Sequence, residues 1–239
     1  MEPALRPLAL PFEHGAWGFL FEPIALGMLV APSREGAYIA IGIVAAFLVR
    51  QPLRLAMRDR LQRKRYPRTA ACEALTLAYG TVAAIAFAMA GIAPLLPLIA
   101  ALPLAAIQFA LDLRNHGRTL TAELCGGVAA GATATAIALA ASLPLAYALT
   151  LWALLALRTV PSILYVRTAL RGGSRASMLA AHAGAVVAAA LLALFAALPM
   201  LMLFARAWPP AEEMRARDIG IREVVYGVVT VALLSIAVS

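Results

Sequence analysis

The chain has 239 residues, of which 63% are hydrophobic and 13% are charged. Soluble domains are about half apolar and about a quarter charged, so this composition excludes an ordinary soluble enzyme and a disordered chain. The formal net charge is +8, but a chain this hydrophobic is not a basic tail that binds nucleic acid.

Several long apolar segments dominate the sequence, and a helix needs about 20 mostly apolar residues to cross a bilayer. Residues 1–11 show no cleavage motif, so we expect no signal peptide to be removed. The loops are short, with proline and glycine at their edges, and none indicates a soluble domain. We therefore predict an all-α polytopic membrane protein, with residues 1–239 forming a single integral membrane helical domain. The predicted spans are residues 16–32, 37–52, 72–91, 94–111, 124–141, 144–163, 178–205 and 221–238.

The segment 178–205 leaves the number of helices at eight or nine. As one helix it would be about 42 Å long, which is long for a single span. A single span would also export the loop 206–222, which carries four arginines. Two shorter helices, broken near residues 191–199, would return that loop to the side where the other arginines lie. Length favours eight helices and charge favours nine, and we prefer nine.

The arginines also predict the orientation. The loop 50–68 carries eight basic residues against one acid, Asp59, whereas the turns 91–94 and 142–144 carry no charge. Because cytoplasmic loops are enriched in lysine and arginine, we expect the 50–68 loop and the N-terminus to face the cytoplasm.

Two other patterns have structural interpretations. Cys72 and Cys125 lie far apart, and Asp112 with His116 would supply only two ligands, so we predict neither a disulfide nor a metal site. Gly127 and Gly131 are four residues apart in the fifth predicted span, which predicts close helix packing.

Polar side chains gather in the cytoplasmic halves of the predicted spans. Ionisable groups within a membrane are costly, so this pattern predicts a polar cavity that opens to the cytoplasm. The alternative is a set of unrelated residues that extend to the interface. Glu22, Arg158 and His182 lie too deep for that alternative. We expect one cavity to bring together Glu22, Asp112, Asn115, Glu123 and Arg158.

Arginines recur every four residues after two of the spans. Arg50, Arg54 and Arg58 share one helix face. Arg167, Arg171 and Arg175 have the same spacing, although glycines at 172 and 173 interrupt that helix. Guanidinium groups can bind phosphate without a metal, although a polybasic face can also simply contact anionic lipid. The candidate catalytic residues are His14, Glu22, Asp112 and Glu123. The candidate ligand-binding residues are Arg50, Arg54, Arg58, Asn115, Arg118, Arg158, Tyr165, Arg167, Arg171 and His182.

Several motifs resemble those of the YwiC-like family of bacterial multi-pass membrane proteins. They are PFEHGAW at 11–17, RQP at 50–52, NHGR at 115–118 with Glu123, and PSILYVR at 161–167 with His182. The resemblance implies a location in the bacterial inner membrane.

A more distant similarity is to UbiA-type intramembrane prenyltransferases. The similarity implies a nine-helix bundle with functional loops after the second and sixth helices, where the two arginine sets lie here. The prenyltransferase loops carry aspartate-rich motifs that hold magnesium. This chain has only Asp59 in the first loop, so no magnesium ligand can be assigned.

Three classes of function fit the sequence. The first, which we prefer, is a lipid-binding protein or a UbiA-like transferase without aspartate-rich motifs, with an anionic or isoprenoid lipid on the arginines. The second is an accessory subunit of a respiratory or biogenesis complex, and the third is a small transporter, which would need polar groups throughout the membrane depth. The residues identify neither a cofactor nor a reaction.

Overall fold

The structure is a computed structural model that describes residues 6–10, 14–209 and 215–238, with the side chains at positions 6, 14 and 15 left out. Helices alone form the regular structure of these residues, with no strand among them. This confirms the all-α prediction. The helices are α1 (Arg6–Ala9), α2 (His14–Val30), α3 (Arg34–Leu61), α4 (Pro67–Ala90), η1 (Ala93–Leu95), α5 (Leu96–Leu113), α6 (Leu120–Ala140), α7 (Leu145–Arg171), α8 (Arg175–Leu192), η2 (Leu194–Ala196), α9 (Ala197–Ala207) and α10 (Ala216–Val238).

The segment predicted as residues 178–205 is broken in two. Ala193 has φ −157° and ψ 115°, an extended conformation that ends α8 before η2 and α9 begin. Pro199, in the first turn of α9, has no N–H to donate to the carbonyl group four residues earlier, which favours a break there. The two pieces pack against each other. The predicted break is therefore confirmed, and the chain reverses at this point.

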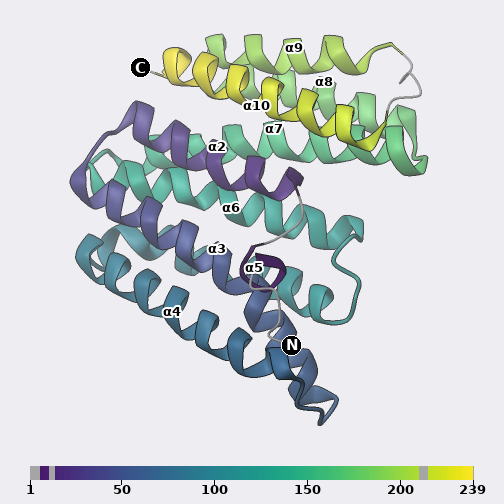
Figure 1. The fold of residues 1–239 in the computed structure, drawn as a ribbon. Helices are drawn as coiled ribbons and strands as arrows, with labels where there is room; N and C mark the ends of the chain where they lie inside the picture. The colour runs from purple at the N-terminus through teal and green to yellow at the C-terminus, as the bar shows by residue number, and fades with distance from the viewer. Residues whose placement is uncertain (1–5, 11–13, 210–214, 239) are drawn as a thin grey trace.

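Helices α2 to α10 run side by side, and each reverses the direction of the one before it (Figure 1). In the described part of the chain, seven helices are long and apolar enough to cross a membrane, and two shorter apolar helices, Ala16–Val30 and Leu194–Ala207, accompany them. The connections after α3, α5 and α7 lie at one end of the bundle, and those after α2, α4 and α6 lie at the other. The arginine-rich loops thus share one end, which we call the arginine end.

The outer faces of the bundle are apolar. Leu77, Ile85, Leu191 and Ile236 are 60 to 84% exposed. A soluble protein rarely exposes so much contiguous apolar surface, whereas lipid tails are its natural surroundings. The protein is therefore a multi-pass integral membrane protein that contacts membrane lipid through these faces.

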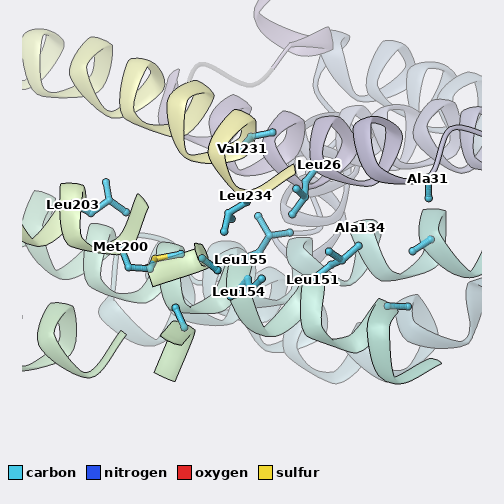
Figure 2. Close-up of a cluster of buried hydrophobic side chains, with 14 residues drawn as sticks. Leu26, Ala31, Ala134, Leu151, Leu154, Leu155, Met200, Leu203, Val231 and Leu234 are labelled. Carbon is cyan, nitrogen blue, oxygen red and sulfur yellow. The ribbon is translucent and has the colours of Figure 1, made fainter. Parts of the chain in front are cut away.

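The central core joins α2, α6 and α7 to α8, η2, α9 and α10. Figure 2 shows Leu26 of α2, Leu154 of α7 and Leu234 of α10 within this cluster. Close packing of α6 against α7 depends on glycine, as the sequence predicts. A Cβ atom at Gly127 would lie 2.6 Å from Thr159 Cγ2, and one at Gly131 would lie 2.8 Å from Trp152 Cδ1. The tight contact of α6 with α7 fixes the position of α7 and of its polar side chains, such as Arg158.

Candidate functional site

Three arginines of α3, Arg50, Arg54 and Arg58, converge on the last turn of α5. Arg54 Nη1 donates to Asp112 Oδ1 at 2.9 Å, and Arg50 Nη2 donates to Asp112 Oδ2 at 3.2 Å. Arg58 donates to the backbone carbonyl groups of Asp112 and of Leu113. Their spacing of four residues aligns the three side chains on the face of α3 that packs against α5. The Asp112 side chain is buried, so this carboxylate depends on arginine for its neutralisation.

Arg54 keeps an unused donor in this cluster. Among the described residues, Arg50 and Arg54 pair with the carboxylate of Asp112, while Arg58 binds two backbone carbonyl groups. The second amino group of Arg54, Nη2, donates to Gln51 Oε1 at 2.6 Å. Arg54 Nε is buried and has no hydrogen-bond acceptor in the described part of the protein. Arg54 therefore retains a donor for an anionic group.

A second arginine cluster lies on the other side of the α5–α6 turn. Arg167 and Arg171 of α7 donate to Glu123 of α6 at 2.8 and 3.2 Å. Both also donate to the backbone carbonyl of Arg118, at 3.0 and 2.8 Å. The turn between α5 and α6 is thus held by arginines of α3 at Asp112 and by arginines of α7 at Glu123. Asn115 lies exposed in this turn with φ 62°, a left-handed conformation that asparagine tolerates.

A third cluster is buried between α2, α7, α9 and α10. Arg158 Nη2 lies 2.8 Å from Glu22 Oε1 and donates to the backbone carbonyl of Glu223 at 3.2 Å. Arg158 Nη1 lies 3.9 Å from Glu223 Oε2, while the other carboxylate oxygen of Glu223 accepts from Arg206 Nη1. These four side chains, Glu22, Arg158, Glu223 and Arg206, form a continuous chain of ion pairs that we call the buried network.

The buried network lies deep in the bundle. Arg158 has 13 residues of α7 on either side, and Glu22 has eight residues of α2 on either side. At 1.5 Å per residue, Arg158 is about 20 Å from each end of its helix. A lone charge at such depth is costly, and the alternation of two arginines with two glutamates removes that cost. Arg158 is only 2% exposed.

Aromatic rings and a histidine complete the surroundings of the buried network. The guanidinium carbon of Arg206 lies 4.1 Å from the ring centroid of Tyr165 and 4.8 Å from that of Tyr226. His182 is 1% exposed, and its Nδ1 lies 2.9 Å from the carbonyl of Met178. Because a carbonyl only accepts, Nδ1 carries the hydrogen and donates it.

Metal binding finds no support in these contacts. Within residues 6–10, 14–209 and 215–238, no group of three or more histidine, cysteine, aspartate or glutamate side chains gathers. The acids of the three clusters are each directed to arginine instead.

A family profile described as YwiC-like protein matches residues 10–138, which is more than half of the chain. The chain belongs to the YwiC-like family. The search of curated proteins and the search of solved structures found no match. The similarity to UbiA-type prenyltransferases therefore stays a prediction. The YwiC-like match runs from α2 into α6 and includes Asp112 and Glu123, whereas α7 to α10 lie beyond it.

The contacts of this YwiC-like protein divide the predicted site residues into three clusters rather than one. Glu22 and Arg158 pair in the buried network, Asp112 pairs with arginines of α3, and Glu123 pairs with arginines of α7. The expectation that these acids share one cavity with Asn115 is therefore corrected. The physical reason is that each acid finds an arginine on its own neighbouring helix: α3 beside α5, α7 beside α6, and α2 beside α7.

The remaining predicted residues are placed as follows. Tyr165 and His182 lie beside the buried network, and Arg118 contributes its carbonyl group to the cluster at Glu123. The side chain of His14 lies outside the described residues. Arg206 and Glu223 of the buried network were not among the predicted site residues. The predicted seventh span ends at residue 205 and so assigns Arg206 to a loop, whereas α9 continues to Ala207.

The buried network leaves no room for a side chain at Gly227 of α10. A Cβ atom there would lie 2.1 Å from Glu22 Oε1 and 3.0 Å from Arg158 Nη2. We expect Gly227→Ala to lower the free energy of unfolding by about 1–3 kcal/mol, because overpacking would displace the ion pair. Thermal unfolding in detergent, followed by tryptophan fluorescence, measures this effect.

Gly220 of the same helix is the matched control. A Cβ atom at Gly220 would meet nothing within 4 Å among the residues the structure places. Gly220→Ala should raise stability by up to about 1 kcal/mol through helix propensity. Equal shifts in both variants would contradict the assigned role of Gly227.

Proposed function

We propose that this YwiC-like protein binds the phosphate headgroup of an anionic lipid at the α5–α6 turn. The supporting observation is the gathering of arginines there around a donor that is not used. Among the described residues, four arginines of α3 and α7 pair with the carboxylates of Asp112 and Glu123, Arg58 binds the backbone carbonyl of Leu113, and the buried Nε of Arg54 has no acceptor. Guanidinium groups form strong, bidentate hydrogen bonds to phosphate oxygens. The apolar outer faces of the neighbouring helices are suited to the lipid tails.

In this proposal Asp112 and Glu123 hold the arginines in position. This positioning role takes the place of the catalytic role that the sequence suggested for each acid. A free guanidinium on a long side chain would lose much conformational entropy on binding. Ion pairs to fixed acids reduce that loss before the ligand arrives. The proposal is therefore one of binding, and it requires neither metal nor cofactor.

The protein should span the inner membrane of a bacterial cell with its arginine end facing the cytoplasm. Cytoplasmic loops are rich in arginine and lysine, and the cytoplasmic leaflet supplies anionic lipid. Single cysteines at Arg65 and Ala93, placed in a chain with Cys72→Ala and Cys125→Ala, should react with an impermeant thiol reagent from opposite sides. Reaction of both from one side would reject this orientation.

The binding proposal can be tested with short-chain phosphatidylglycerol and the purified protein in non-ionic detergent. Arg54→Gln and Arg167→Gln should each weaken binding at least fivefold, and binding should persist in EDTA because arginine carries the charge. Arg65→Gln is the control that removes the same charge: Arg65 is exposed at the same end and forms no hydrogen bond or ion pair with the described residues. Arg68 would be a poor control because it pairs with the buried Asp59 at 2.9 Å.

Three outcomes separate the alternatives. Loss of binding in EDTA would reject the arginine site and favour a metal-dependent transferase. Equal losses in all three arginine variants would indicate nonspecific attraction to anionic lipid. Mass spectrometry of lipids that copurify with the protein distinguishes a phospholipid from an isoprenoid phosphate, since both offer the same phosphate chemistry.

A further inference from the structure

Arg206 carries a hydrogen-bonding edge that the described residues do not use. Its Nη1 binds Glu223, but Nε and Nη2 are buried and have no acceptor among the side chains and carbonyls that the structure describes. The Arg206 side chain is 6% exposed. In a guanidinium group, the N–H bonds of Nε and Nη2 point in the same direction from one edge. Two parallel donors of this kind match two oxygens of one oxyanion.

The plane of this edge is fixed by two aromatic rings. Tyr165 of α7 and Tyr226 of α10 lie 4.1 and 4.8 Å from the guanidinium carbon of Arg206. Cation–π contacts of this kind hold a guanidinium without occupying its N–H groups. The bond to Glu223 restrains the third nitrogen. The edge is therefore rigid before any ligand binds, which reduces the entropy cost of binding.

The same helices carry further unpartnered polar atoms. Arg158 Nε of α7 and Thr230 Oγ1 of α10 are also buried without a hydrogen-bond partner in the described structure. A buried donor without an acceptor is costly, and a charged donor is more costly than a neutral one. An oxyanion bound at the Arg206 edge would remove this cost for Nε and Nη2.

The charges of the buried network limit the ligand class. Among the described side chains, Glu22 and Glu223 balance Arg158 and Arg206, so no excess positive charge faces the ligand. A doubly charged phosphate would be repelled by the two glutamates more strongly than a singly charged group. Two parallel donors still require two acceptor oxygens. A singly charged oxyanion satisfies both conditions.

We propose that the Nε–Nη2 edge of Arg206 is a second binding site, for a singly charged oxyanion, either a carboxylate or a phosphodiester. Tyr165 and Tyr226 orient the edge, and Glu223 holds the opposite side of the guanidinium group. The site is built from α7, α9 and α10. It shares no residue with the lipid site at the α5–α6 turn and does not depend on it.

Titration calorimetry in non-ionic detergent tests this site with two probes, octanoate as a carboxylate and dihexanoyl-phosphatidylglycerol as a phosphodiester. The protein carries Arg54→Gln, which weakens the α5–α6 site and so separates the two sites. Counting only binding that Arg206→Lys weakens, octanoate alone assigns a carboxylate site, the phospholipid alone assigns a phosphodiester site, and both together assign a general site for singly charged oxyanions. Failure of both probes to bind at millimolar concentration would overturn the proposal.

Arg206→Lys is the decisive variant, because lysine keeps the charge beside Glu223 but has no bidentate edge. We expect at least a tenfold loss of affinity. Arg222→Lys, at an exposed position of α10, should change the affinity less than twofold. If Arg206→Lys does not fold, Tyr226→Leu replaces it, since that variant keeps every charge and removes one ring; at least a threefold loss is expected. Unchanged affinity in Arg206→Lys, or in Tyr226→Leu where it is used, would reject the site.

Discussion

Replacement of Arg158 by leucine is expected to lower the free energy of unfolding by about 3–5 kcal/mol, the usual cost of removing one partner from a buried ion pair. Arg158 is 2% exposed and is the only ion-pair partner of Glu22 within the described structure. Its loss would leave the carboxylate of Glu22 near the middle of α2, where water cannot solvate it. Glu223 would keep Arg206. The main damage should therefore come from Glu22.

A double variant separates this effect from a simple loss of packing. In Arg158→Leu with Glu22→Leu, the unpaired carboxylate is removed together with its partner. We expect the double variant to be more stable than Arg158→Leu alone, by at least about 1 kcal/mol. Size-exclusion chromatography in detergent and thermal unfolding measure both the folded fraction and the stability. Strictly additive losses would mean that the pair is not coupled and that Arg158 acts through packing.

The fold follows from features that are local in sequence. Hydropathy and short loops predict helices because lipid requires every backbone group to be paired within its own segment. The break at Ala193 was predicted by a different argument, from the charge of the loop that follows α9. Helix ends were less certain. The predicted end at residue 205 fell two residues before the end of α9, and that small error removed Arg206 from the candidate site.

The pairing of site residues could not be predicted in the same way. Arg54 and Asp112 are 58 residues apart, and their contact depends on α3 packing against α5. The sequence shows that Arg50, Arg54 and Arg58 share a face, but it does not show which helix that face meets. It also gives no sign that Tyr165 and Tyr226 both contact the guanidinium group of Arg206. The types of the site residues and their depth in the membrane could be predicted from the sequence. Their ion-pair partners could not, because these depend on which helices pack together.

Replacement of Asp112 by asparagine should have opposite effects on stability and on ligand binding. Asp112 is 3% exposed, and its carboxylate accepts hydrogen bonds from Arg50 and Arg54. Asparagine keeps the shape but removes the charge, so the α3 arginines repel one another. We expect a loss of about 1–3 kcal/mol, the range for hydrogen bonds to charged groups. In neutral detergent, thermal unfolding should show this loss in full.

Anionic lipid should restore much of that lost stability, because a phosphate can take the place of the missing carboxylate among the arginines. The affinity of Asp112→Asn for short-chain phosphatidylglycerol should rise at least threefold over that of the unmodified protein. Asp59→Asn is the matched control: Asp59 is equally buried, but it pairs with a single arginine, Arg68, in the described structure. Asp59→Asn should lose stability without gaining affinity. A gain of the same size in both variants would show that any unpaired arginine at this end attracts the lipid. Unchanged affinity in Asp112→Asn would place the headgroup away from the α5–α6 turn, whereas weaker binding would mean that the positioning of the arginines by Asp112 outweighs the negative charge that it contributes.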